Sequence, residues 1–285
     1  MINENTRIPL TAAVGGAAAL TVRAWNLRTG FETGTGLPIS GPSFPALLTV
    51  LAVVGLSLIL QSLRLTERGA VRFPFRAGQS ALCVPAIAGA FLLALSGATD
   101  IFESVTGEKA LSILRGRQTY EYAYTGLISG EAVGMSGGVQ RFCGLLTLCA
   151  ALSVFVCVRA CLRGNLPFRA IVLIPAVALS FRLVTIYRID SVNPVLQDYA
   201  PALVALMLQV WGFYCFSAFA FDCGNLTAFA ISSGAAACAA LCVVLDESDY
   251  ISTPLALCGS AAALVGFLLL ALRSPSAPDE SDAQS

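Results

Sequence analysis

Eight long apolar runs divide the sequence, and most approach the roughly 20 residues that a helix needs to cross a bilayer. A spanning segment must satisfy its backbone hydrogen bonds internally, so apolar runs of this length fold as helices in lipid. We therefore predict an all-α, polytopic transmembrane helical bundle of about eight spans. The predicted spans are Ile8–Leu27, Pro45–Leu63, Ser80–Leu95, Phe142–Cys161, Phe168–Tyr187, Val195–Phe221, Leu226–Leu245 and Ile251–Leu272.

The charge content supports the same class of protein. Charged residues make up 12% of the chain and hydrophobic residues 56%. A soluble domain carries about twice that share of charge, so we predict that the main partner of this chain is the lipid bilayer. Lys plus Arg and Asp plus Glu are equal at 17 each, which gives no sign of a nucleic-acid partner. Other membrane subunits are the candidate protein partners.

Arginines cluster after the second and the fourth predicted spans, and basic loops stay on the cytoplasmic side of a membrane. Counting spans outward from both clusters places the two termini inside the cell and the acidic loop Asp246–Asp249 outside. The clustered residues are Arg64, Arg68, Arg72, Arg76, Arg159, Arg163 and Arg169.

This topology gives one transmembrane domain over residues 1–273 and a disordered cytoplasmic tail over residues 274–285. Residues 96–141 form a long outer loop, in which Ile101–Leu114 is a candidate surface helix. The first span has an alternative interpretation as a cleaved signal peptide, because Ala17–Ala19 offers small residues. Gly15 and Gly16 interrupt its apolar core, which favours a retained helix.

The chain contains no His, which excludes His-dependent triads and the usual catalytic zinc sites. Gly134–Gly138 reads G-M-S-G-G and is similar to the G-x-S-G of rhomboid proteases, whose Ser needs a His to take its proton. We therefore interpret Ser136 as a loop residue. The ten Cys lie in apolar runs or at their ends without any C-x-x-C, so we predict free packing thiols. No catalytic residue, metal site or cofactor is predicted.

Small residues form stripes in the last two predicted spans. Gly259 and Gly266 lie on one face of the eighth span, and Gly234 and Cys238 are spaced by one turn in the seventh. Such stripes permit close contact between helices. We expect packing within the bundle rather than dimerisation.

Two segments carry a resemblance to a known group of proteins. Thr29–Leu51 reads T-G-F-E-T-G-T-G-L-P-I-S-G-P-S-F-P-A-L-L-T-V-L, and Asn193–Tyr199 reads N-P-V-L-Q-D-Y, with F-A-F-D-C-G following at Phe219–Gly224. These segments resemble parts of uncharacterised multi-pass membrane proteins of anaerobic Gram-positive bacteria. The resemblance extends from the first span to about Gly224. It implies a multi-pass protein of the bacterial cell membrane and carries no known activity.

Arg182 is a charged residue inside the apolar run Phe168–Tyr187. A charge at the bilayer centre costs about 2.5–3.5 kcal/mol on insertion scales, so such a residue usually faces the protein and has a partner. Asp198 lies about one turn into the next span, and a short turn joins the two spans. We therefore predict an Arg182–Asp198 pair at similar depth. Gln209 shares a helix face with Asp198, and Tyr187 and Tyr199 flank the predicted pair.

This predicted cluster has two interpretations. One is a structural ion pair that fixes the register of the two helices, and the other is a site for a ligand or an ion. The structural interpretation is favoured, because most charged residues in membrane helices are satisfied by a partner.

Three classes of function follow from these observations. The first is a transporter for a small molecule, or the substrate-binding membrane subunit of one, and it is supported by the polar outer ends of the fifth and sixth spans. The second is a non-catalytic membrane scaffold or assembly factor, which fits the absence of any catalytic motif. The third is a membrane-embedded enzyme that works without His. We place the transporter-like class first and the enzyme last.

Overall fold

The computed structural model describes residues 4–32, 38–67, 71, 73–75, 80–106, 136–191, 196–246 and 250–274. This part of the chain contains eight long helices and three short 3-10 helices. The long helices are α1 (Glu4–Thr29), α2 (Ser43–Leu63), α3 (Val84–Thr106), α5 (Gly137–Arg163), α6 (Ile174–Asp190), α7 (Leu196–Ala220), α8 (Leu226–Cys242) and α9 (Ser252–Arg273). The short ones are η1 (Arg64–Glu67), η2 (Ser80–Cys83) and η3 (Arg169–Leu173).

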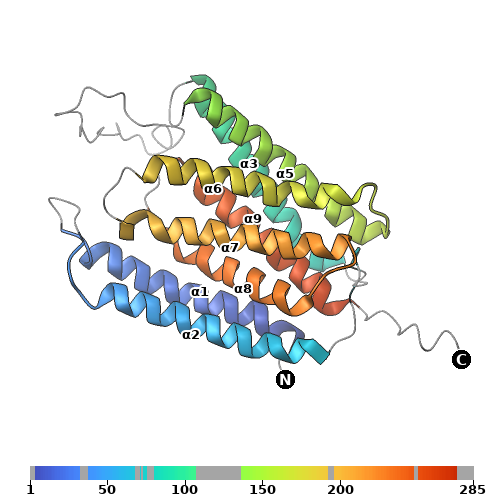
Figure 1. Ribbon diagram of the computed structural model, residues 1–285, viewed down its shortest axis with the longest axis horizontal. Helices are drawn as coiled ribbons and strands as arrows, with labels where there is room; N and C mark the ends of the chain where they lie inside the picture. Colours follow the sequence, from blue (N-terminus) through green and yellow to red (C-terminus); the bar gives the residue numbers. More distant parts are fainter. Residues whose placement is uncertain are drawn as a thin grey trace, which may run out of the picture.

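The helices form one elongated bundle in which their axes run roughly along a common direction (Figure 1). Helices α1 and α2 pack together and against α8, while α7 lies between α6 and α8. Helix α3 packs along both α5 and α9, and these two interfaces are the most extensive in the described chain. The predicted all-α bundle is confirmed, since no strand element occurs among the described residues.

Seven of the helical segments are long and apolar enough to cross a membrane, and α8 is a shorter apolar helix. Helix α9 is the most buried of the seven candidates, and α2 is the least. The outward face of α2 carries large apolar side chains such as Leu48, Val53 and Leu60, each more than half exposed. Exposed apolar faces on a charge-poor bundle are typical of helices that contact lipid.

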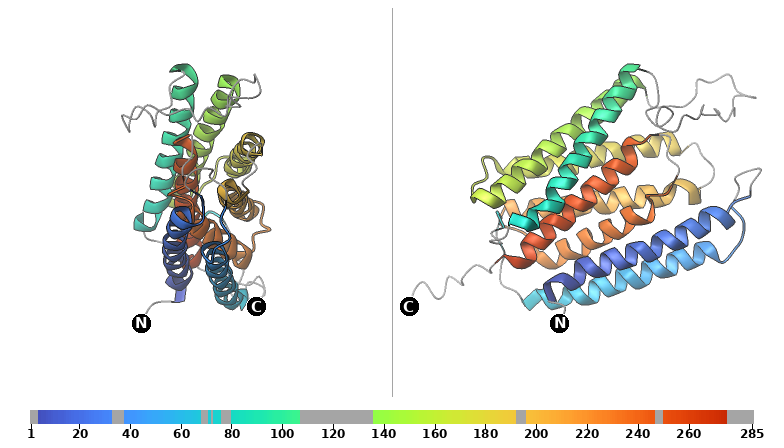
Figure 2. Two further views of the ribbon diagram at one scale, coloured as in Figure 1. Left: turned by 90° about the vertical axis from the view of Figure 1, so that its left-hand side faces the viewer. Right: turned by 180° about the vertical axis from the view of Figure 1, so that it is seen from behind.

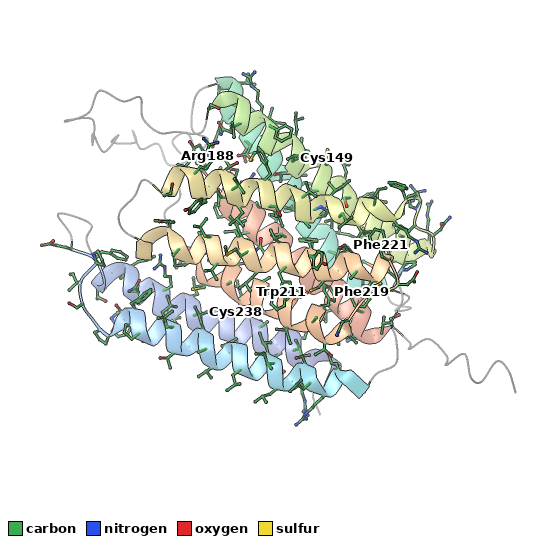
Figure 3. The ribbon with its side chains drawn as sticks, in the orientation of Figure 1. Cys149, Arg188, Trp211, Phe219, Phe221 and Cys238 are labelled. Carbon is green, nitrogen blue, oxygen red and sulfur yellow. The ribbon has the colours of Figure 1, made fainter. Side chains whose placement is uncertain are left out.

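The two ends of the bundle differ in which elements meet there. At one end α3 and α6 finish and α5 begins, and α9 starts close by; we call this the site end. At the other end α1 begins and α9 finishes, and we call this the termini end (Figures 1 and 2). Figure 3 shows Arg188 near the site end and Phe219 and Phe221 near the termini end.

The third span is longer than predicted. Helix α3 runs through Thr106, so Asp100 and Glu103 belong to a membrane helix and not to an outer loop. Residues 96–106 and 137–141 of the predicted loop are therefore helical, and the predicted surface helix from Ile101 overlaps the end of α3. Two carboxylates lower the hydropathy of this segment, but both side chains are buried against neighbouring helices. Residues 107–135 and the predicted tail from 275 onward lie outside the described residues.

Local signals at the helix ends follow ordinary capping chemistry. Ser136 is the N-cap of α5, where its hydroxyl accepts a hydrogen bond from the Val139 backbone N–H, which gives this Ser a structural role. Asn225 caps α8 in the same manner. Gly164 ends α5 in the left-handed conformation with φ 74°, which glycine adopts without steric cost.

Glycines bring α3 and α9 into close contact. A Cβ added to Gly259 would lie 2.8 Å from the Leu93 backbone N, and one added to Gly266 would lie 2.5 Å from the Ala86 backbone N. The prediction that these small residues serve packing inside the bundle is confirmed. All ten Cys carry free thiols.

Phenylalanine rings fill the core toward the termini end. Phe73 and Phe75, from the segment before α3, pack against Phe216 and Phe219 of α7. Phe216 also stacks on Phe267 of α9 with ring centroids 4.3 Å apart. These rings form an apolar core in the half of the bundle nearer the termini end. The cluster of buried polar groups around Arg182 lies in the other half or midway along the bundle.

Candidate functional site

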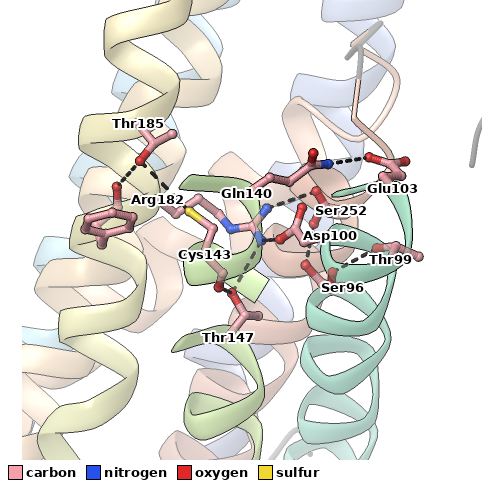
Figure 4. A network of polar contacts seen from close by, with 11 residues as sticks. Ser96, Thr99, Asp100, Glu103, Gln140, Cys143, Thr147, Arg182, Thr185 and Ser252 are labelled. Carbon is pink, nitrogen blue, oxygen red and sulfur yellow. Dashed lines mark hydrogen bonds and ion pairs between the residues drawn. The ribbon is translucent and has the colours of Figure 1, made fainter. Parts of the chain in front are cut away.

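Arg182 is buried in the interior of the bundle and forms an ion pair with Asp100 of α3 (Figure 4). Its NH2 group donates to Asp100 Oδ2. Arg182 lies eight residues before the end of α6, which places it about 12 Å along the helix from that end. The side chain reaches across the bundle, because α6 packs along α5 and α7 and has no extended contact with α3 or α9 in the described residues.

Two hydroxyl groups also contact the guanidinium. Arg182 NH1 donates to Ser252 Oγ at 3.3 Å, and NH2 donates to Thr147 Oγ1 at 3.3 Å. Ser252 is the first residue of α9, and Ser96 of α3 donates to its backbone carbonyl at 2.6 Å. Four helices, α3, α5, α6 and α9, therefore contribute polar groups to one buried cluster, which we call the Arg182 cluster.

The ion pair leaves one strong donor and one strong acceptor unused. Among the described residues, Arg182 Nε and Asp100 Oδ1 have no hydrogen-bond partner, although both side chains are almost fully buried. A buried charged group without its full set of hydrogen bonds is costly, so such an atom in a native protein calls for an explanation.

A second carboxylate lies one turn nearer to the site end. Glu103 is 4% exposed and accepts a hydrogen bond of 2.9 Å from the side-chain amide of Gln140 on α5. Ser96, Asp100 and Glu103 follow each other at spacings of four and three residues, so they share one face of α3. The polar face of α3 thus continues from the Arg182 cluster toward the site end.

The packing of α3 against α5 supports this arrangement. A Cβ on Gly144 would lie 3.0 Å from the Cβ of Asp100, and a Cβ on Gly97 would lie 2.7 Å from the Gly144 carbonyl. The glycines let the two backbones approach each other closely. Asp100 is therefore held on a rigid pair of helices, whereas Arg182 is carried by a helix outside that pair.

The structure gives Arg182 a different partner from the predicted one. Asp100 takes the role expected of Asp198, whose side chain lies outside the described residues although its backbone belongs to α7. Gln209 is fully buried, but its amide donates to the Leu257 carbonyl at 2.8 Å and accepts from Ser260 Oγ, so its described bonds are to α9. Ser260 lies two turns beyond Ser252, or about 12 Å along α9.

The two tyrosines of the predicted cluster form no described hydrogen bond with Arg182. Tyr187 is 55% exposed on another side of α6, and Tyr199 is half-buried near the start of α7. Neither residue forms a described hydrogen bond within the Arg182 cluster.

Sequence reasoning missed Asp100, Thr147 and Ser252, which contact Arg182 directly. A signal for Asp100 was present, because the predicted span Ser80–Leu95 was shorter than the roughly 20 residues that a bilayer requires. Extending it toward its C-terminus would have brought Asp100 into a membrane helix. No comparable signal marks Thr147 or Ser252, since single hydroxyl residues are common in membrane helices.

A second buried arginine lies in the other half of the bundle cross-section. Arg23 of α1 is fully buried and binds Asp246, just after α8, through Nε to Oδ1 at 2.8 Å and NH2 to Oδ2 at 3.0 Å. Its NH1 donates to Asn26 Oδ1 at 3.0 Å, and Asn26 in turn donates to Ser43 Oγ of α2. This pair ties α1 and α2 to the end of α8.

The Arg182 cluster can bind through hydrogen bonds and charge rather than through a metal ion. In the described chain, no group of three or more Cys, Asp or Glu side chains is placed to hold a metal. The cluster offers a guanidinium, a carboxylate and two hydroxyls, which together recognise polar organic groups.

Comparison with known proteins adds no relative from which a role could be transferred. No protein-family model matches the chain, and neither a curated protein sequence nor a solved structure is significantly similar to it.

Proposed function

We propose that this protein is a transporter for a small polar molecule, or the substrate-binding membrane subunit of one, and that the Arg182 cluster is its binding site. The observation that carries the proposal is the pair of unused atoms, Arg182 Nε and Asp100 Oδ1, in a buried ion pair. Ionisable residues inside membrane bundles commonly mark substrate or ion pathways. A donor and an acceptor without partners offer a ligand two charged contacts at once.

The packing of the helices supports a site that opens. Asp100 lies on α3, which is held tightly against α5 and α9, whereas Arg182 lies on α6, which packs along α5 and α7. A displacement of α6 from α3 and α9 would separate the ion pair without disturbing the glycine contacts. Membrane transporters move groups of helices about a fixed site in this manner.

The charge distribution supports an orientation. Exposed arginines are more numerous in the segments at the termini end, where they are Arg7, Arg64, Arg159, Arg163, Arg169 and Arg273, than in those at the site end, where they are Arg28, Arg141 and Arg188. Under the rule that basic segments stay in the cytoplasm, the termini end faces the cytoplasm and the site end faces outward. The proposal includes a bacterial cell membrane as the location and kinship with the multi-pass proteins of anaerobic Gram-positive bacteria that the two sequence segments resemble.

A thermal-stability screen of the purified protein in detergent tests the proposal. The panel spans amino acids, organic acids, amines, sugars and nucleobases. A compound present at 100 times its Kd stabilises the folded state by about 2.7 kcal/mol, which corresponds to a rise in Tm of about 5 °C. We expect at least one such compound.

Two variants localise the effect to the cluster. Asp100→Asn should lower the rise in Tm to about half or less, while Asp222→Asn, which alters an exposed ion pair at the other end, should retain it. Uptake of the compound into proteoliposomes then separates a complete transporter from a binding subunit. An equal rise for wild type and Asp100→Asn, or no stabilising compound in the panel, would contradict the proposal and favour a scaffold role.

A further inference from the structure

The two unused atoms of the Arg182 cluster also specify the chemistry of a ligand. We infer that the cluster binds a small zwitterion that carries a carboxylate and an ammonium group close together, as a free α-amino acid does. This inference rests on the proposed binding function and adds the class of the ligand to it.

Complementary hydrogen bonding is the first argument. Arg182 Nε is a charged donor and Asp100 Oδ1 is a charged acceptor, and both are buried without a partner among the described residues. A carboxylate satisfies the first and an ammonium satisfies the second with charge-assisted bonds, which are about twice as strong as neutral ones. The two atoms belong to side chains already joined through NH2 and Oδ2, so a ligand that reaches both must carry its charged groups close together.

Charge balance is the second argument. Arg182 and Asp100 carry opposite charges and are 2% and 1% exposed, so the pair is neutral as a unit. An anion or a cation bound there would add an uncompensated charge to a buried region, which is strongly unfavourable. A zwitterion leaves the charge of the buried region unchanged. The carboxylate of Glu103 lies one turn along α3, where it accepts a hydrogen bond from Gln140, so the neutrality argued here is that of the Arg182–Asp100 pair alone.

The arrangement of neighbouring groups is the third argument. Ser252 and Thr147 contact the guanidinium from α9 and α5, so they hold Arg182 through NH1 and NH2 and leave Nε available. Gly144 packs against the Asp100 side chain, which limits the space beside it. We therefore expect a ligand with a small or no side chain at the carbon that joins its two charged groups.

Equilibrium binding to the wild-type protein tests the inference directly, with radiolabelled glycine as the probe. Glycine should bind, and unlabelled L-alanine should compete with it. Acetate and methylammonium, which each carry half of the zwitterion, should compete at least tenfold more weakly, because each leaves one charged atom of the pair unsatisfied. An acetate or methylammonium affinity equal to that of glycine would overturn the inference.

The zwitterion inference can fail while the proposed binding function stands, and the experiment distinguishes the two failures. If glycine does not bind but another class of compound stabilises the wild type and not Asp100→Asn, the binding site stands and the zwitterion inference fails. If glycine binds equally to wild type and Asp100→Asn, the zwitterion is bound elsewhere and the inference fails as well. The wild-type competition series decides the matter even if Asp100→Asn does not fold.

Discussion

The two buried arginines of this protein form ion pairs of different kinds. Arg23 uses Nε and NH2 to bind both oxygens of Asp246, and its NH1 binds Asn26. Arg182 binds one oxygen of Asp100 through NH2, and the neighbouring Nε and Oδ1 have no partner in the described structure. A bidentate pair with its donors satisfied serves as a fixed link between helices. The pair of Arg182 retains unused binding capacity, which is what a ligand site requires.

The positions of the two pairs agree with this distinction. Asp246 is 13% exposed at the end of α8, where water can share the cost of its charge. Asp100 is 1% exposed within α3 and depends on protein groups alone. If Arg182 served only to link helices, a bidentate pair like that of Arg23 with Asp246 would stabilise the fold more than the single contact with Asp100 does.

The largest effect should come from removing one partner of the more deeply buried pair. Arg182→Leu strands Asp100 in the interior and should lower the free energy of unfolding by about 3–5 kcal/mol. Adding Asp100→Leu should recover much of this loss, because apolar replacement of both partners is often close to neutral. Thermal unfolding in detergent of both single variants and the double variant gives the interaction free energy between Arg182 and Asp100.

Asp198→Leu is the matched control for that cycle, because Asp198 is the carboxylate that the sequence alone suggested as the partner. It should not rescue Arg182→Leu. Rescue by Asp198→Leu and additive losses with Asp100→Leu would show that the pairing of Arg182 with Asp100 is wrong.

The pair of Arg23 should respond more weakly to the same change. Arg23→Leu leaves Asp246 partly hydrated, so we expect a loss of about 1–3 kcal/mol. The variant should leave binding at the Arg182 cluster unchanged once the protein is folded. A loss larger than that of Arg182→Leu, measured in the same detergent, would reverse the ranking of the two pairs.

The rigid support of Asp100 can be tested at the contact between α3 and α9. Gly266→Ala places a Cβ 2.5 Å from the Ala86 backbone N, and overpacking of this kind costs about 1–3 kcal/mol. Gly55→Ala on α2 is the control, because a Cβ there meets nothing within 4 Å. Its Tm should stay the same or rise, since Ala favours a helix over Gly by about 1 kcal/mol. Equal losses for both variants would show that the contact is not tight.

Much of the fold could be predicted from the sequence because apolar runs of bilayer length have one solution, the helix. The partner of Arg182 could not be predicted in the same way. Asp198 is near Arg182 in the chain, whereas Asp100 comes from a helix that lies far away in sequence and meets α6 only through tertiary packing. Hydropathy also ended the third span at Leu95, because it counts a carboxylate as outside the membrane whether or not an arginine faces it.

Arg23 illustrates the same limit. It lies inside the first predicted span, Ile8–Leu27, and it is fully buried within α1 and paired with Asp246. Both charges are separated by most of the chain, so only the packing of α1 against α8 brings them together. Charged residues in apolar runs can thus be recognised from sequence as paired, while the identity of the partner depends on the helix arrangement.

The smallest effect should come from the exposed pair Arg169–Asp222, whose side chains are 62% and 53% exposed at 3.0 Å. Asp222→Asn should change the free energy of unfolding by less than about 1 kcal/mol, as is usual for surface ion pairs. Asn also tolerates the positive φ of 61° at this turn. A loss comparable to that of the buried pairs would show that side-chain exposure does not predict how much an ion pair contributes to the free energy of unfolding.

Ligand binding to one aspartate variant of each buried pair compares the Arg182–Asp100 pair with the Arg23–Asp246 pair most directly. The measurement is the Kd of the compound that most stabilises the wild-type protein, determined for Asp100→Asn and Asp246→Asn in the same detergent below the Tm of both. If the Arg182–Asp100 pair is the binding site, Asp100→Asn weakens binding by at least tenfold, which corresponds to the loss of about one charge-assisted hydrogen bond. The Kd of Asp246→Asn should stay within about twofold of the wild-type value. Equal Kd values for the two variants would contradict the assignment of the Arg182 cluster as the binding site.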